Sequence, residues 1–183
     1  MTSVLLTLQR LVPSAAGFAI GFPVLAFLCW VYSPTFLYNL LPSAGTVKPA
    51  TMAAVFACGL SLWLQAHEPA VTRTRRRMAQ GFAGFACLLA GLTMLEYLLS
   101  LDLGIDLWLA SVPDIAVDPH PGRMAPATAF AILMLGLALL TLDSTHGRHE
   151  DASHYLALLG GTVGAIALVG YLYGVQTLYK VGT

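Results

Sequence analysis

Charged side chains are scarce in this sequence: only 10% of its 183 residues are Asp, Glu, Lys or Arg, against about 25% in a soluble domain. Five windows contain no charged residue, and each is long enough to cross a bilayer, which takes about 20 mostly apolar residues. The windows lie between Arg10 and Lys48, Lys48 and Glu68, Arg77 and Glu96, Arg123 and Asp143, and Asp151 and Lys180. This scarcity excludes an ordinary soluble domain, and no basic cluster is large enough to predict binding to nucleic acid.

Cysteine and histidine are also rare. The three cysteines (Cys29, Cys58 and Cys87) all fall inside the apolar windows, where we expect small buried hydrophobic side chains and no disulfide. A haem within the bilayer would need two histidines facing each other near helix midpoints, and none of the five histidines lies there (His67, His120, His146, His149 and His154). We therefore expect no metal site and no cofactor.

The length of the apolar windows predicts the fold class. Backbone polar groups inside a bilayer must be paired within a helix or a closed barrel, and barrel strands alternate in polarity over about 10 residues. The windows are longer and continuously apolar, so we predict an all-α integral membrane protein with the lipid bilayer as its main partner. The five predicted transmembrane helices are 14–32, 50–66, 79–99, 124–143 and 153–173.

Basic residues predict the orientation in the membrane. The loop predicted between the second and third helices holds four arginines (Arg73, Arg75, Arg76 and Arg77), and basic loops stay in the cytoplasm. Alternation then places the N-terminus in the cytoplasm and the 100–123 loop outside. The outside loops carry four aspartates instead (Asp102, Asp106, Asp114 and Asp118).

A short internal repeat suggests how the helices are organised. Residues 49–62 (PATMAAVFACGLSL) resemble residues 126–139 (PATAFAILMLGLAL) at an offset of 77. Proline suits the first position of a helix because its missing N–H would be unpaired there. We predict a helix–outer loop–helix repeat within one membrane domain over 1–183. Unit one is 14–66, unit two is 79–143, and 153–183 is the first half of a unit three whose sixth helix is expected in the parent protein.

Three segments resemble a known group of proteins. They are Leu95-Glu-Tyr-Leu-Leu-Ser-Leu-Asp-Leu-Gly-Ile-Asp, Pro121-Gly-Arg-Met-Ala-Pro-Ala-Thr-Ala and Gly170-Tyr-Leu-Tyr-Gly-Val-Gln-Thr-Leu-Tyr. Together they are similar to the N-terminal membrane region that precedes PAS, histidine kinase or diguanylate cyclase domains in bacterial signalling proteins. The resemblance implies a sensory module in the bacterial inner membrane, a cytoplasmic output domain in the parent chain, and a homodimer.

Glu96 is the most informative side chain, because an ionisable residue in a spanning segment is costly and often functional. An ordinary interfacial acid is the competing interpretation. Arg123 precedes the fourth predicted helix at the same outer boundary, so we predict that the two pair. The pair would serve either as structural glue or as a site for a small polar ligand.

Four further residues are candidates for ligand binding or switching. Asp102 and Asp106 are four residues apart, so one helical turn would present both on one face. With Asp114, Asp118 and His120 they form either a solvated acidic loop or a weak cation site. Thr51 and Thr128 occupy equivalent repeat positions, where they would bond their own backbone or face a shared cavity.

The sequence thus predicts a membrane-embedded sensory module that is not itself an enzyme and has no catalytic residues, although the parent protein could carry a kinase or cyclase. It would relay an outer-leaflet or periplasmic stimulus to the output domain. The alternative is a small transporter or channel built from repeats, which the lack of intramembrane charge other than Glu96 disfavours.

Overall fold

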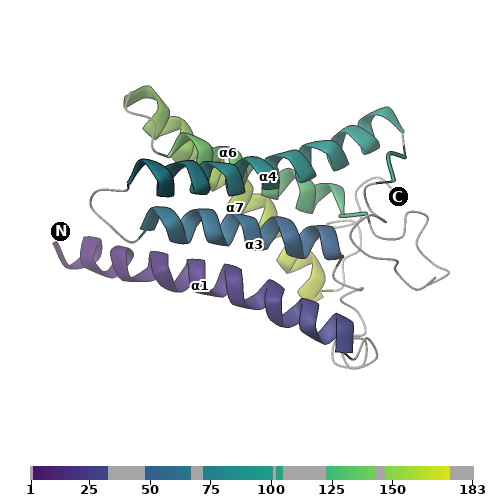
Figure 1. The fold of residues 1–183 in the computed structure, drawn as a ribbon, viewed down its shortest axis with the longest axis horizontal. Coiled ribbons are helices and arrows are strands. Elements are labelled where there is room, and N and C mark those ends of the chain that lie inside the picture. Colours follow the sequence, from purple (N-terminus) through teal and green to yellow (C-terminus); the bar gives the residue numbers. More distant parts are fainter. Residues whose placement is uncertain are drawn as a thin grey trace.

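The computed structural model describes residues 2–32, 48–66, 72–100, 102–104, 123–142 and 147–173 (Figure 1). The described chain is all-helical and contains no strand, which confirms the predicted all-α class. Its five helices are α1 (Thr2–Tyr32), α3 (Pro49–Ala66), α4 (Arg73–Leu99), α6 (Pro126–Thr141) and α7 (Gly147–Tyr173).

Three helices begin at least six residues earlier than predicted: α1 at Thr2, α4 at Arg73 and α7 at Gly147. The prediction followed hydropathy, which marks the apolar part of a helix, whereas backbone hydrogen bonding continues into polar sequence. The four arginines predicted in a loop therefore lie in the first turns of α4, and that part of the prediction was wrong.

Within the described ranges, four helices are long and apolar enough to cross a membrane: α1 over Leu11–Cys29, α3, α4, and α7 over Ala152–Gly170. The fifth, α6, has 16 residues and a length of about 24 Å, against about 30 Å for a hydrocarbon core. Length and composition thus support four of the five predicted spans. These helices are compatible with a multi-pass membrane protein.

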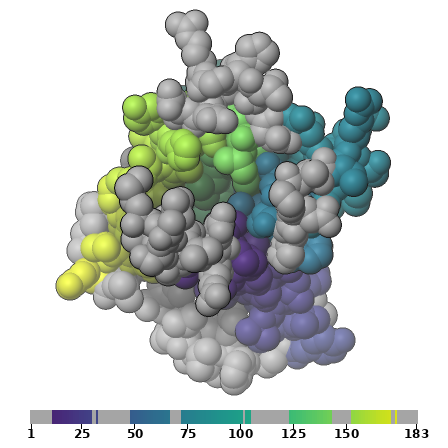
Figure 2. Space-filling view, turned by 90° about the vertical axis from the view of Figure 1, so that its left-hand side faces the viewer, coloured from purple at the N-terminus to yellow at the C-terminus, as the bar shows by residue number. Residues whose placement is uncertain are grey.

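Consecutive helices pack side by side in chain order. α1 packs on α3, α3 on α4, α4 on α6 and α6 on α7, and α3 also contacts α6. Neighbours run in opposite directions, so the α3–α4 and α6–α7 connections share one end of the bundle (Figure 1). Figure 2 views the bundle from this end and shows α7, in yellow, and α4, in teal, at opposite edges.

The core is built from small side chains, and the large ones face outward. Where the structure describes side chains, twelve of the sixteen buried hydrophobic residues are alanines. Large apolar side chains are exposed along the helices, with Phe18 at 72%, Leu88 at 60% and Leu158 at 67%. A soluble protein buries its large apolar residues, whereas helices in a bilayer meet through small residues.

Glycines bring the helices together at three points. A Cβ on Gly59 would meet the Ala19 backbone of α1 at 2.9 Å, and one on Gly160 would meet the Ala131 carbonyl oxygen of α6 at 2.9 Å. A Cβ on Gly136 would overlap the Cys87 sulfur of α4. Gly81, Gly84, Gly91, Gly161 and Gly164 have no such neighbour within 4 Å.

Candidate functional site

A buried ion pair links the end of α4 to the start of α6. Glu96 lies in the last turn of α4 and is 1% exposed, and Arg123 lies three residues before α6 and is 5% exposed. Arg123 Nε is 3.3 Å from Glu96 Oε2. The predicted pairing of these residues is confirmed, while their role in ligand binding or switching stays a prediction.

Glu96 also organises the turn that ends α4. Ser100 adopts a left-handed conformation (φ 50°), and its N–H donates to the Glu96 carbonyl. The Leu103 N–H donates to Glu96 Oε1 at 2.9 Å. One residue thus holds the chain after the helix through its backbone and its side chain, because the last carbonyls of a helix lack intrahelical donors.

Asp102 is the second carboxylate that faces Arg123. Its Oδ1 lies 3.5 Å from Arg123 Nη2, and its side chain is 77% exposed. The same oxygen accepts the N–H of Gly104 at 3.1 Å. An exposed ion pair contributes little to stability because solvent screens it, so Glu96 is the stronger of these two carboxylate partners of Arg123.

The prediction that Asp102 and Asp106 share one helical face was wrong for Asp102. α4 ends at Leu99, and residues 102–104 are not helical. The left-handed Ser100 and the positive φ of Gly104 (67°) explain the break, because neither conformation continues a right-handed helix. Asp106 lies outside the described residues, as do Asp114, Asp118 and His120.

Tyr97 is the residue of this site that sequence reasoning missed. The Arg123 guanidinium carbon lies 5.4 Å from the centre of the Tyr97 ring. The Tyr97 hydroxyl donates to the Met124 carbonyl at 3.1 Å. Two features of the sequence could have predicted this contact: Tyr97 is next to Glu96, and Arg side chains bind aromatic faces. We call Glu96, Tyr97, Asp102 and Arg123 the Arg123 clasp.

One oxygen of the clasp has unused hydrogen-bonding capacity. Among the described residues, Glu96 Oε2 is the buried side-chain atom that has no hydrogen-bond partner. Its contact with Arg123 is electrostatic and lacks hydrogen-bond geometry. The clasp can therefore hold a charge pair out of water and accept one further donor, from a water molecule or a small polar group.

A second polar cluster lies at the opposite end of the bundle. Gln65 of α3 donates to Ser61 Oγ at 3.0 Å and to the Leu139 carbonyl of α6 at 3.4 Å. Ser153 of α7 donates to the neighbouring Ala138 carbonyl at 3.1 Å. These contacts join three helices, and isolated Ser and Gln residues in apolar helices are a weak sequence signal for them.

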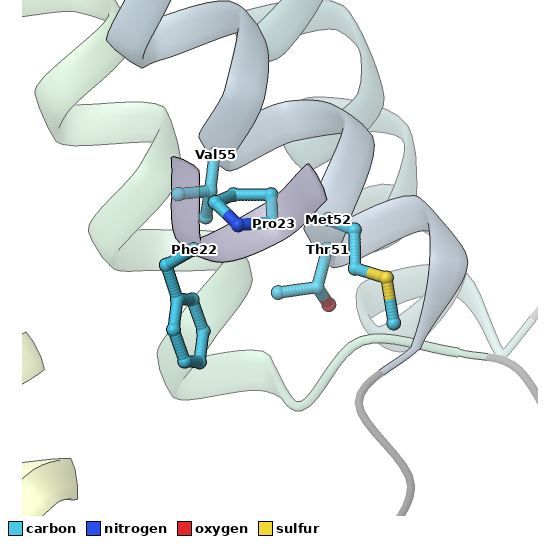
Figure 3. A pocket seen from close by; sticks show the side chains of 5 residues that line it. All are labelled: Phe22, Pro23, Thr51, Met52 and Val55. Atoms are coloured by element: carbon cyan, nitrogen blue, oxygen red, sulfur yellow. The ribbon is translucent and has the colours of Figure 1, made fainter. Parts of the chain in front are cut away.

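Thr51 and Thr128 do not share either of the two hollows found between α1 and α3. Thr51 of α3 lines a hollow of about 40 Å³ between α1 and α3, where Thr51, Met52 and Val55 face Phe22 and Pro23 (Figure 3). Thr128 lies on α6 and lines neither this hollow nor the larger one beside it. The predicted shared cavity between repeat units therefore finds no support in these two hollows.

The described residues also include histidine, cysteine and carboxylate side chains that could in principle bind a metal ion. No group of three or more His, Cys, Asp or Glu side chains in that part of the chain is arranged to hold a metal ion. Cys29, Cys58 and Cys87 are free and half-buried.

No family model, no curated protein and no solved structure matches this chain at a significant level.

Proposed function

We propose that the chain is the membrane-embedded input module of a bacterial signalling protein. It relays an outer-leaflet or periplasmic stimulus to a cytoplasmic output domain, works as a homodimer and performs no catalysis itself. The observation that carries this proposal is the Arg123 clasp, a buried ion pair at the junction of α4 and α6. It adds to the resemblance of the segments around Glu96 and Arg123 to sensory membrane regions.

Placement in the bacterial inner membrane is supported by the small buried fraction of the apolar helices. Only 11% of the spanning window of α7 and 17% of that of α1 are buried, against 39% of that of α3. Exposed leucines and phenylalanines over such long helices would aggregate in water. Lipid tails are their natural environment.

The arginines at the start of α4 support a cytoplasmic N-terminus. α4 has no acidic residue in its first turn, and four arginines there oppose the positive end of the helix dipole. Local helix stability therefore does not explain them, whereas retention of basic segments in the cytoplasm does. The clasp, at the other end of α4, then lies at the outer surface.

Several details support the repeat. Gly59 of α3 approaches the helix before it, and so does Gly136 of α6, its equivalent at the offset of 77. The first turns match as well: the Met52 N–H donates to the Lys48 carbonyl at 3.1 Å, and the Ala129 N–H to the Ala125 carbonyl at 2.9 Å. The proposed architecture is five crossings, with α6 the short one, and a sixth helix in the parent protein.

A signalling mechanism follows from this geometry. The clasp fixes the end of α4 to the start of α6, and each helix then runs unbroken to the end that bears the arginines. α4 has 27 residues and a length of about 40 Å, so a displacement at the clasp is carried through the membrane. In this mechanism the clasp exists in a closed state, with Glu96 and Arg123 paired, and an open state. A stimulus shifts the equilibrium between the two states only if it binds them with different affinity.

The test is a chimera that joins residues 1–183 to the catalytic region of a histidine kinase. We expect Glu96→Gln and Arg123→Gln to change autophosphorylation in membranes, while Leu98→Ala, at a neighbouring exposed position (74%), leaves it unchanged. Identical output from all three variants would refute the proposal. Solute flux through proteoliposomes of the isolated chain would favour the transporter alternative instead.

A further inference from the structure

An apolar groove runs along the contact between α1 and α3. It has a volume of about 230 Å³, and its walls include Pro23 and Phe27 of α1 and Met52, Ala53 and Phe56 of α3. Pro49, the first residue of α3, lines one end. The hollow beside Thr51 shares Pro23 and Met52 with the groove and extends it.

The groove lies where α1 diverges from α3 beyond their closest approach. Gly59 packs against the Ala19 backbone, whose carbonyl has no helical donor because Pro23, four residues later, lacks an N–H. Beyond this contact α1 slopes away from α3 toward its C-terminal end (Figure 1). The separated part is where the groove lies.

The internal repeat places a large side chain in α6 at the position where α3 has a small one in the groove wall. Ala53 lines it, and the equivalent residue of α6 is the half-buried Phe130. A benzyl group thus stands in α6 where α3 has a methyl group. Replacing Ala53 by Phe copies the residue of the second unit.

The surroundings of the groove identify its occupant. Val24, Phe27 and Leu28 in its wall are between 42% and 46% exposed, so the opening faces lipid in the proposed membrane placement and admits an apolar chain. At the Pro49 end, the positive charge of Lys48 and the positive end of the α3 helix dipole favour an anion. Pro49 to Phe56 spans about 10 Å along the helix.

We infer that this groove binds one long-chain fatty acid, with its carboxylate at Lys48 and the start of α3 and its alkyl chain between α1 and α3. A single groove between two helices accommodates one chain, whereas a phospholipid carries two. This inference rests on the proposed sensory function and names its class of stimulus. An inserted chain would change the crossing of α1 and α3 around the Gly59–Ala19 contact.

The test uses the whole chain in phosphatidylcholine nanodiscs with a palmitic acid that carries a photoactivatable diazirine. Mass spectrometry maps the adducts. We expect them on α1 and α3 beside the groove, with competition by palmitate and not by hexadecanol, which lacks the charge. Lys48→Gln should lower their yield.

Ala53→Phe should reduce the yield about tenfold, the loss expected when about two methylene groups are excluded from an apolar site. The matched control is Ala165→Phe on the exposed face of α7, which should leave the yield unchanged. Thermal unfolding in detergent checks that both variants fold.

Three results would each overturn the inference: adducts spread evenly over all lipid-facing helices, an unchanged yield in Ala53→Phe, or equal competition by phosphatidylglycerol, which would assign the groove to a bilayer lipid. The readout needs no output domain. Failure of the labelling is therefore distinguishable from failure of the signalling chimera.

Discussion

At the scale of single residues, Glu96 and Arg123 of the clasp are buried charges whose loss of hydration is offset by several contacts. Removing a carboxylate and a guanidinium from water costs several kcal/mol per ion, about as much as their attraction returns. Additional partners decide the balance: the Leu103 N–H for Glu96, and the Tyr97 ring for Arg123. Removing one member of the clasp therefore lowers the free energy of unfolding by more than that residue's own contact contributes.

The first prediction is a double-mutant cycle on the ion pair. Arg123→Gln leaves the Glu96 carboxylate buried without its cation, and we expect a loss of about 3 kcal/mol of unfolding free energy. Glu96→Gln should cost less, because the amide oxygen still accepts the Leu103 N–H. The double variant should cost less than the sum. Strictly additive thermal stabilities in detergent would show that the pair does not interact.

The second prediction separates the two roles of Tyr97. Tyr97→Phe keeps the ring beside Arg123 and loses the hydrogen bond to the Met124 carbonyl, at a cost of about 1 kcal/mol. Tyr97→Leu also removes the aromatic face and should cost about 1 kcal/mol more. Urea unfolding in mixed micelles would measure both variants. Equal stability of the Phe and Leu variants would mean that the ring contact contributes nothing.

At the scale of elements, close approach of helix backbones replaces the interlocking of large side chains. Seven of the fourteen buried residues described for α3 and α4 are alanines, so mostly small side chains lie between the helices. The closest contacts between helices then occur at glycines. The atom of the neighbouring helix that faces each glycine decides how much a substitution there destabilises the protein. Ala19 presents rigid backbone to Gly59, while Cys87 presents a side-chain sulfur to Gly136.

The third prediction compares alanine at buried and open glycines. Gly59→Ala places a Cβ 2.9 Å from the Ala19 backbone, and we expect a destabilisation of about 1–3 kcal/mol. Gly136→Ala should cost less, because the Cys87 sulfur can rotate. Gly161→Ala, which meets nothing within 4 Å, should be neutral or stabilising by up to about 1 kcal/mol. Thermal unfolding in one detergent ranks them, and a Gly161 variant as unstable as the Gly59 variant would contradict this reasoning.

At the scale of the whole molecule, the two ends of the bundle differ in chemistry. One end carries the arginines of α4, with Arg75 lying 5.9 Å from the centre of the Trp63 ring of α3. The other carries the clasp, whose acidic and basic groups pair with each other. This asymmetry is the basis of the proposed orientation, with the arginine end in the cytoplasm, since basic residues resist translocation and acidic residues contribute little.

The fourth prediction concerns this orientation. The native cysteines are replaced, and single cysteines are introduced at the exposed positions Thr72 and Leu103. A maleimide that cannot cross membranes should label the Leu103 position in intact bacteria and the Thr72 position only after permeabilisation. Labelling in the reverse pattern would invert the topology, with the clasp then in the cytoplasm.

The sequence by itself determined the helical class, the approximate position of all five helices and the pairing of Glu96 with Arg123. Local quantities explain this success: an apolar run must be helical in lipid, and two opposite charges at one helix boundary have few other partners. Only the tertiary structure decided the rest. The break after Leu99, the Tyr97 ring beside Arg123 and the contact between Gly59 and Ala19 depend on how separate helices approach each other. Hydropathy records the affinity of each segment for lipid and contains no information on which faces of two apolar helices meet.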